Sequence, residues 1–188
     1  VATAVITGLD EIQNSGRDAV HNLVKSRIKN VEKTLRNRIA ASLYGDGTGS
    51  SGKELGGLAL LVADVNTNQV GGIPASSETW WRNYVYDFST QSVTPSKDTI
   101  QHAMNTAWLN AIRGVDRPDM IPADMVYYNY YLESLTPQQR FSDDKNAGAG
   151  FTNLMFMGVC PVIFDDQCPA SHMYLLNTDY LFLRPSPK

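Results

Sequence analysis

Cysteine is scarce in this chain of 188 residues, which contains only Cys160 and Cys168. Two cysteines are too few for a disulfide scaffold, so we expect buried free thiols and a reducing compartment.

No apolar run approaches the roughly 18–20 residues of a membrane span. The nearest run, Leu55–Val65, is interrupted by two glycines and an aspartate, and we expect no membrane partner. The start, Val1–Thr7, lacks the basic region of a signal peptide, and a start at valine predicts processing or excision from a longer chain.

Metal-ligand spacing is also lacking. The arrangement that comes nearest is Cys160, Cys168 and His172, with Asp165 or Asp166 as a fourth ligand. Its C-x7-C-x3-H spacing differs from the short pairs, two to four residues apart, that are typical of zinc sites. We therefore predict no metal site and no cofactor.

A local signature of catalysis is missing as well. The three histidines, His21, His102 and His172, fall on three different expected elements, and no serine lies in a G-x-S-x-G setting. The acidic pairs at 143–144 and 165–166 are expected to be solvated turns, because adjacent residues on a strand point to opposite faces. We predict that the chain is not an enzyme, and a hydrolase whose triad assembles only in space is kept as an alternative.

One glycine-rich segment resembles a phosphate-binding loop without completing it. Gly47–Lys53 matches the first seven positions of the pattern G-x-x-x-x-G-K-[ST], but the eighth is Glu54, whose carboxylate would repel phosphate. The segment also comes after an expected helix, whereas a phosphate-binding loop comes after a strand. We therefore predict a flexible connector.

What the sequence does contain is one long amphipathic helix, expected from Arg17 to Leu43. About 27 residues at about 1.5 Å each give a rod of roughly 40 Å, which we interpret as a spine. Apolar residues at helical spacing form a stripe that we expect to face a core. These stripe residues are Val20, Leu23, Val24, Ile28, Val31, Leu35, Ile39 and Leu43.

Four cations, which we call the basic ridge, recur along the same helix on the face expected to be opposite the stripe: Lys25, Lys29, Lys33 and Arg36. Like charges at this spacing repel by roughly 0.2–0.5 kcal/mol per pair. The ridge is therefore either a solvated face or the contact of an anionic neighbour, such as an acidic protein surface or DNA phosphate.

Charge is divided unevenly along the chain. Residues 1–43 carry seven Lys and Arg against four acids, and residues 44–188 carry nine against fifteen. The sequence pI of about 5.5 argues against a nucleic-acid-binding module, which usually has a basic balance. Such a module, using the basic helix, is kept as an alternative.

The remainder predicts an α+β fold. A second helix is expected after a cap at Thr94 or Ser96 and ends before Gly114, with Trp108 on its buried face; a third, capped by Asp124, runs to Leu135. Leu58–Val65 is expected to be a buried strand or short helix, and 66–74 a loop. The expected strands are Met120–Ala123, Leu154–Phe156, Pro161–Phe164, His172–Leu176 and Tyr180–Leu183.

Aromatic and arginine side chains are the candidates for subunit contacts. On an extended chain adjacent rings point oppositely, so we expect one of Trp80 and Trp81 to be buried and the other exposed. On the third helix, the tyrosines at 127, 130 and 131 are expected to share one face, with Tyr128 elsewhere. The candidate interface residues are Trp80, Trp81, Arg82, Tyr128 and Arg117.

Taken in order, several short segments resemble the major capsid proteins of tailed bacteriophages. They extend over roughly residues 10–184 and come after the spine helix: Leu43–Gly49, Gly56–Leu58, Val70–Ile73, Trp80–Asn83, Arg113–Gly114, Arg117–Asp119 and Met173–Leu181. The resemblance implies the tailed-phage major capsid protein fold, with residues 1–52 as a piece of a peripheral domain and 53–188 as a mixed α/β axial domain. The resemblance further implies that the N-terminal arm and most of the extended loop of that family are missing from this sequence, and we expect the same of a C-terminal strand region.

The same resemblance implies a function. The chain would be a structural subunit of an icosahedral head shell that self-assembles into pentamers and hexamers around the genome. Its partners would be further copies of itself, a scaffolding protein, a portal and packaged DNA held without sequence specificity. It would be located in the virion after assembly in the cytoplasm of the bacterial host.

Overall fold

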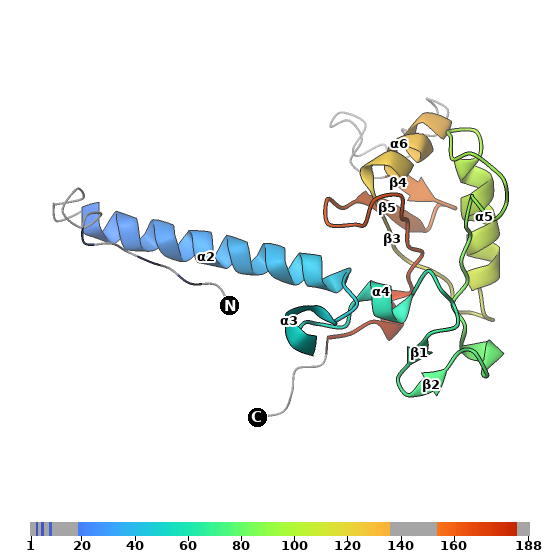
Figure 1. The fold of residues 1–188 in the computed structure, drawn as a ribbon. Coiled ribbons are helices and arrows are strands. Elements are labelled where there is room, and N and C mark those ends of the chain that lie inside the picture. The colour runs from blue at the N-terminus through green and yellow to red at the C-terminus, as the bar shows by residue number, and fades with distance from the viewer. Residues whose placement is uncertain (1–2, 4, 6–7, 9–18, 136–153, 184–188) are drawn as a thin grey trace. The chain divides into compact units, whose positions relative to one another are not determined.

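Two units make up the chain, Val1–Leu60 and Leu61–Lys188, here called unit 1 and unit 2. The computed structural model describes residues 3, 5, 8, 19–135 and 154–183 (Figure 1). Helices and strands are both present, which confirms the α+β class. The division into domains at residues 52 and 53 stays a prediction.

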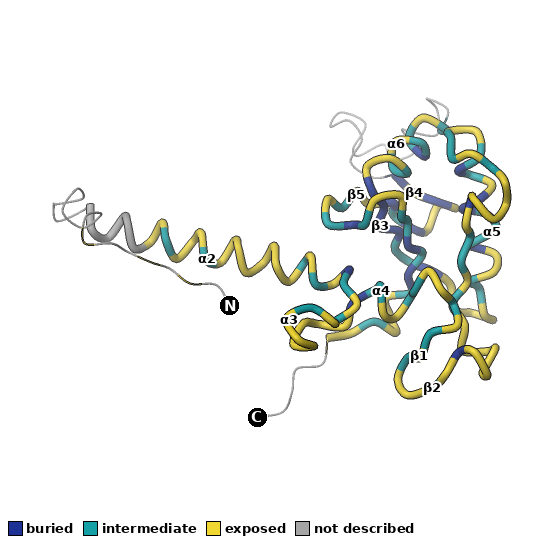
Figure 2. The backbone as a smooth tube through the Cα atoms, in the orientation of Figure 1, coloured by how far each residue is buried: buried dark blue, intermediate teal, exposed yellow. Residues whose placement is uncertain are grey.

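Unit 1 is dominated by helix α2, Ala19–Leu43, whose 25 residues contain neither glycine nor proline. The expected spine helix is confirmed, although Arg17 and Asp18 lie outside the described residues. For the described side chains the expected burial of its apolar stripe is wrong: Ile28 is 53% exposed, Leu35, Ile39 and Leu43 are exposed as well, and Val31 is half-buried. The side chains of Val20, Leu23 and Val24 lie outside the described residues. Figure 2 shows the helix as mostly exposed along its described length. The apolar period placed these residues along one side of the helix but carried no information about what covers them.

The basic ridge does not oppose this stripe. At about 100° per residue, its four cations lie on average about 125° around the helix axis from the stripe, so the ridge flanks it. All four of these side chains are exposed. Helix α2 therefore presents an apolar band and a neighbouring cationic band.

The glycine-rich segment after α2 folds back tightly on the end of that helix. Tyr44 is buried, and the amide of Gly57 donates to the carbonyl of Gly45 at 2.9 Å. A Cβ on Gly57 would lie 2.2 Å from the carbonyl oxygen of Leu43, so only glycine fits there. The segment includes one short turn, α3 (Gly49–Gly52). The segment connects α2 to the next helix, as expected, and its flexibility stays a prediction.

Unit 2 is built on a three-stranded sheet in the order β3-β5-β4. Strand β5 (Cys160–Phe164) lies in the middle, parallel to β3 (Ile121–Ala123) and antiparallel to β4 (Leu154–Phe156). These three expected strands are confirmed. The expected strand His172–Leu176 forms only isolated bridges, and the expected strand Tyr180–Leu183 is preceded by a 3-10 turn, η2 (Thr178–Tyr180), and contains no strand residue.

Two helices cover the sheet and complete the core. They are α5 (Ile100–Ala111) and α6 (Met125–Ser134), and the Asp124 side chain caps α6 by accepting from the amide of Tyr127 at 2.9 Å, as predicted. Trp108 of α5 meets Phe156 of β4 edge to face, with ring centroids 5.4 Å apart. The buried cluster is Phe88, Ile100, Ala103, Met104, Trp108, Ile121, Tyr131, Leu154, Phe156, Cys160 and Val162.

A small hairpin lies where a loop was expected. Strands β1 (Gln69–Val70) and β2 (Ile73–Pro74) pair antiparallel around Gly71 and Gly72, whose φ angles of 61° and 82° suit glycine. The segment before it forms a short helix, α4 (Leu58–Leu61), one of the two alternatives expected. Its expected burial is wrong, because Leu60 and Leu61 are exposed.

Candidate interaction surfaces

The tryptophan pair lies in a 3-10 turn, η1 (Thr79–Trp81), shortly after the β1–β2 hairpin. Trp80 is 69% exposed and Trp81 41%, so the expectation that one would be buried is wrong. The rings meet edge to face with centroids 5.6 Å apart. Their indole nitrogens donate to Glu78 Oε2 at 2.7 Å and to the Val70 carbonyl at 3.2 Å. With both polar tips bonded, the pair presents apolar ring surface in a fixed geometry.

The Arg82 side chain, which comes directly after this pair, makes two hydrogen bonds to backbone carbonyls. Its Nε donates to the carbonyl of Ala75 at 2.7 Å and its Nη2 to the carbonyl of Ser76 at 2.9 Å. These bonds join the residue after the tryptophans to the end of the hairpin. The structure thus brings Trp80, Trp81 and Arg82 together around one turn.

The other two candidate residues lie on different elements. Tyr128 is on α6, half-buried, with its ring centroid 6.1 Å from that of Phe164, and burial raises its pKa above the usual value. Arg117 is exposed in the loop before β3. Tyr131, in contrast, is a core residue: it is buried, its hydroxyl donates to the Met155 carbonyl at 3.0 Å, and burial raises its pKa to about 12.

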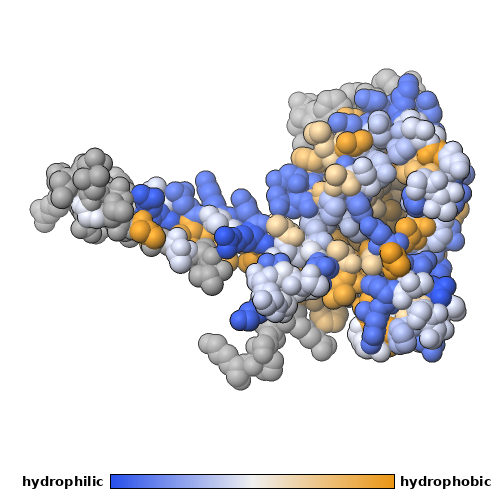
Figure 3. All heavy atoms as spheres, viewed as in Figure 1, coloured by the Kyte–Doolittle hydropathy of each residue, from blue (hydrophilic) through white to orange (hydrophobic). Residues whose placement is uncertain are grey.

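Apolar side chains along α2 form the second surface. Figure 3 shows hydrophobic patches alternating with hydrophilic side chains along the helix. Residues 19–43 contain six Lys and Arg against one acid, Glu32. The surface therefore combines apolar contact with positive charge, which suits an acidic, partly apolar neighbour.

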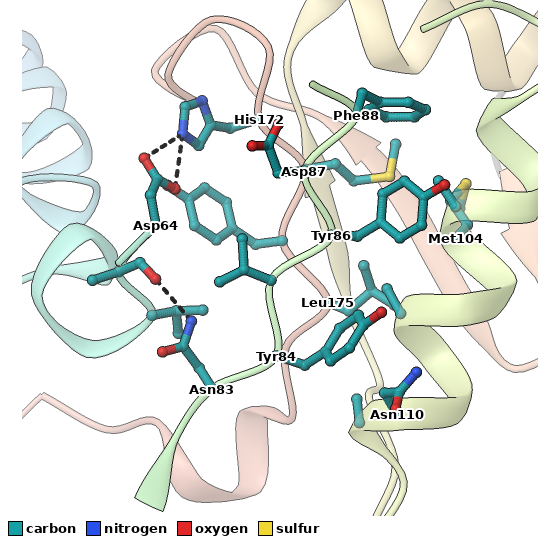
Figure 4. Close-up of a pocket in the computed structure, with 18 of the residues that line it drawn as sticks. Asp64, Asn83, Tyr84, Tyr86, Asp87, Phe88, Met104, Asn110, His172 and Leu175 are labelled. Atoms are coloured by element: carbon teal, nitrogen blue, oxygen red, sulfur yellow. Dashed lines mark hydrogen bonds and ion pairs between the residues drawn. The ribbon is translucent and has the colours of Figure 1, made fainter. Parts of the chain in front are cut away.

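A cavity of about 700 Å³ opens in unit 2 between α5, the extended segment 82–88 and residues 171–175 (Figure 4). Aromatic and amide side chains line it, among them Tyr84, Tyr86, Tyr174 and Asn110. No signal in the sequence indicated this site, because its walls come from three distant segments.

At the rim of this cavity His172 pairs with Asp64. The Nε2 atom lies 3.1 Å and 3.2 Å from the two carboxylate oxygens, and Nδ1 lies 2.8 Å from the carbonyl of Ala170 (Figure 4). The sequence pattern singled out His172 as a possible zinc ligand or catalytic histidine and gave no signal of this pairing, since the two residues are 108 positions apart.

The structure also shows the residues that were considered for zinc binding and for phosphate binding. Cys160 and Cys168 are buried free thiols, as predicted, and burial raises the pKa of each to about 12. Among the described residues, no three His, Cys, Asp or Glu side chains are grouped to hold a metal.

In the glycine-rich segment, Ser50 Oγ donates to Glu54 Oε1 at 3.0 Å, and a Cβ on Gly49 would meet Glu54 Oε2 at 2.2 Å. The segment thus packs around its own carboxylate.

Comparison with known proteins yields a likeness in fold. No protein-family model matches the chain, and no curated protein matches its sequence. Its structure is similar to a chain of the cyanophage A-1(L) capsid asymmetric unit, with a TM-score of 0.55 and 23% identity over 92% of this chain and 53% of that one. The chain spans about half the length of that capsid chain and has a phage capsid-like fold. None of the described helices is long and apolar enough to cross a membrane.

Proposed function

We propose that this chain is a structural subunit of a tailed-phage head shell and has no catalytic role. The observation that carries the proposal is the fold shared with a cyanophage capsid chain over 92% of the present sequence. In the shell, copies would form pentamers and hexamers that enclose the genome. The subunits would be assembled in the bacterial cytoplasm and would be located in the virion. Residues 1–52 would belong to the peripheral domain and 53–188 to the axial domain.

The exposed apolar surfaces support this role physically. A subunit that assembles needs surface whose desolvation is favourable, at about 25 cal/mol per Å² of apolar area. The tryptophan pair supplies such area in a fixed geometry, and Trp and Arg are enriched among residues that dominate interface energetics. We infer that Trp80 and Trp81 are anchors, that Arg82 positions them, and that Tyr128 and Arg117 contribute at other edges.

The basic ridge would meet either the genome or an acidic surface of a neighbouring subunit. Unit 2 contains eight Lys and Arg against thirteen Asp and Glu in its sequence, so a second copy offers the complementary charge. DNA offers it too, without reading base sequence. A scaffolding protein and a portal would be further partners in assembly.

Two other functions are less well supported. A nucleic-acid-binding module conflicts with the acidic balance of the chain and the sequence pI of about 5.5. A hydrolase with a triad assembled in space would need a histidine between a hydroxyl nucleophile and a carboxylate. His172 has the carboxylate of Asp64, but its other ring nitrogen faces a backbone carbonyl.

Negative-stain microscopy and sedimentation velocity on the concentrated chain test the shell role. We expect rings of five or six subunits or closed shells, and we expect Trp80→Asp to abolish them while leaving the far-UV circular dichroism unchanged. Lys97→Asp, at an exposed position outside the proposed contacts, is the control and should assemble normally. A chain that stays monomeric at every concentration, or a Trp80→Asp variant that assembles normally, would contradict the proposal.

A further inference from the structure

The chain enters unit 2 through a short segment after α4, residues 62–65, which we call the connector. Two side-chain contacts hold it. The Asn83 amide donates to the carbonyl of Ala63 at 2.8 Å, and the Asp64 carboxylate faces Nε2 of His172 at 3.1 Å. The first contact joins neutral groups. The second depends on the charge of an imidazole.

Both ring nitrogens of His172 face oxygen acceptors. A neutral imidazole carries one N–H and one lone pair, so it can donate to the Ala170 carbonyl or to the Asp64 carboxylate but not to both. The imidazolium ion donates to both and is attracted by the carboxylate. The geometry therefore fits the charged form better than either neutral tautomer.

The groups around the His172 ring add negative charge, and few of them are themselves charged near pH 7. Asp124 lies close by and accepts from the amide of Ser171 at 2.8 Å through its other carboxylate oxygen. The Tyr174 ring stacks on the imidazole with centroids 6.0 Å apart, and the Cys168 thiol contacts the His172 carbonyl at 3.6 Å. Burial raises the pKa of both Tyr174 and Cys168 to about 12, so both are neutral near pH 7. Other charged groups that line the cavity are Arg82, Asp87 and Arg113.

We propose that His172 and Asp64 form a proton-operated clasp on the connector, closed when the imidazole is charged and weakened when it is neutral. Because the connector is the segment through which the chain enters unit 2, the clasp sets how freely that segment moves. This inference concerns the connector alone and does not depend on the shell role.

The direction of the pH dependence is set by the same contacts. Burial lowers the pKa of His172, but the Ala170 carbonyl and the Asp64 carboxylate raise it by more, and the net pKa lies above the ordinary 6.5. A group whose pKa is raised on folding contributes its stabilisation fully below the unfolded value and loses it as pH rises through the folded value. The clasp is therefore closed below about pH 6.5 and opens above it, around the folded pKa of His172.

Two measurements on the full chain test the clasp. NMR titration of the ring signals of labelled histidine, assigned with His172→Gln, should give a pKa above 6.5 for His172. The isosteric change Asp64→Asn should lower that pKa, whereas His102→Gln, at an exposed histidine on α5, should leave it unchanged. A pKa at or below 6.5, or one that Asp64→Asn does not lower, would overturn the proposal.

Mobility of the connector is the second readout. A spin label on Val65→Cys, at a position 67% exposed, is selective because the native thiols are buried and have raised pKa values. Between pH 5 and 8 the label should become more mobile with a midpoint at the pKa of His172, and Asp64→Asn should remove this midpoint. Asn83→Ala should increase mobility at every pH and leave the midpoint in place. A label whose mobility does not change with pH in the otherwise native chain would show that His172 does not control the connector.

Discussion

Helix α2 and helix α5 have the same kind of sequence pattern and opposite burial. Both carry apolar residues at helical spacing. In α5 these residues enter the core, where Trp108 is 5% exposed, whereas in α2 Ile28 is 53% exposed and Leu35, Ile39 and Leu43 are exposed as well. The difference lies in the elements that come after each helix along the chain. Helix α5 is succeeded by strands and a second helix that cover it, and the described residues of unit 1 after α2 form only the short turn α3 and the start of α4.

An apolar stripe therefore indicates that one face of a helix is to be buried, but it does not indicate which surface covers that face. Exposed apolar area of this kind in one chain is typical of a surface that another surface covers. This distinction between a covered and an uncovered stripe leads to four predictions about the free chain.

The largest effect is expected in the covered helix. Trp108→Ala should lower the free energy of unfolding by about 3–5 kcal/mol, because it removes a buried ring and leaves a cavity. Its neighbour Leu109 is 68% exposed, and Leu109→Ala should change stability by no more than about 0.5 kcal/mol. Urea denaturation measures both. Equal losses would mean that α5 is packed by a different face.

The turn that ends α2 comes next. Gly57→Ala should destabilise unit 1 by about 1–3 kcal/mol, because the added methyl would meet the Leu43 carbonyl oxygen at a clashing distance. Gly45→Ala is the matched control, since its nearest neighbour would lie at an ordinary 3.4 Å. Thermal melting followed by circular dichroism at 222 nm compares the two. A control variant as unstable as Gly57→Ala would show that the tight turn is not what distinguishes them.

The cap of α6 should have an intermediate effect. Asp124→Ala removes the acceptor for the Tyr127 and Ser171 amides and should lower stability by about 1 kcal/mol. Asp124→Asn keeps an oxygen acceptor and should lose less. Asp166→Ala, at an exposed aspartate, controls for the change in charge. If Asp166→Ala lost as much as Asp124→Ala in urea denaturation, net charge and not the cap would be responsible.

The smallest effect is expected on the uncovered stripe. In dilute solution, Ile28→Asp and Lys29→Asp should each change the free energy of unfolding by about 0.5 kcal/mol or less, since both side chains are already solvated. A loss of several kcal/mol for Ile28→Asp alone would show that the stripe is covered within a single chain, and the contrast between α2 and α5 would disappear.

The sequence predicted those parts of the fold that are encoded locally. The length of α2, the cap at Asp124 and the strands β3, β4 and β5 all depend on residues within one turn or one strand of each other. The second helix was predicted as well, but its start was wrong, because α5 begins at Ile100 after Thr99 and not after Thr94 or Ser96. The position of Gly71 and Gly72 also carried a local signal, since paired glycines suit a two-residue hairpin turn, but the short strands beside them were predicted to be loop.

What could not be predicted depends on the local turn geometry or on distant residues. Both indoles are exposed because residues 79–81 form a 3-10 turn held by Glu78 and the Val70 carbonyl. The clasp between His172 and Asp64 and the walls of the cavity require the folded unit 2. Whether the candidate interface residues and the basic ridge contact other subunits stays a prediction.

The mixed sheet of unit 2 has a consequence for synthesis on the ribosome. Strands β4 and β5 are joined by a short turn through Met157 and Gly158, so they can pair as soon as both have emerged. Strand β3 is made earlier, and its partner β5 comes roughly 40 residues later, which takes roughly 2–8 s at about 5–20 residues per second. Throughout that interval the nascent chain exposes an apolar strand whose three residues are all buried in the finished protein. We expect chaperone binding during translation to concentrate in this interval, before Phe164 has left the exit tunnel.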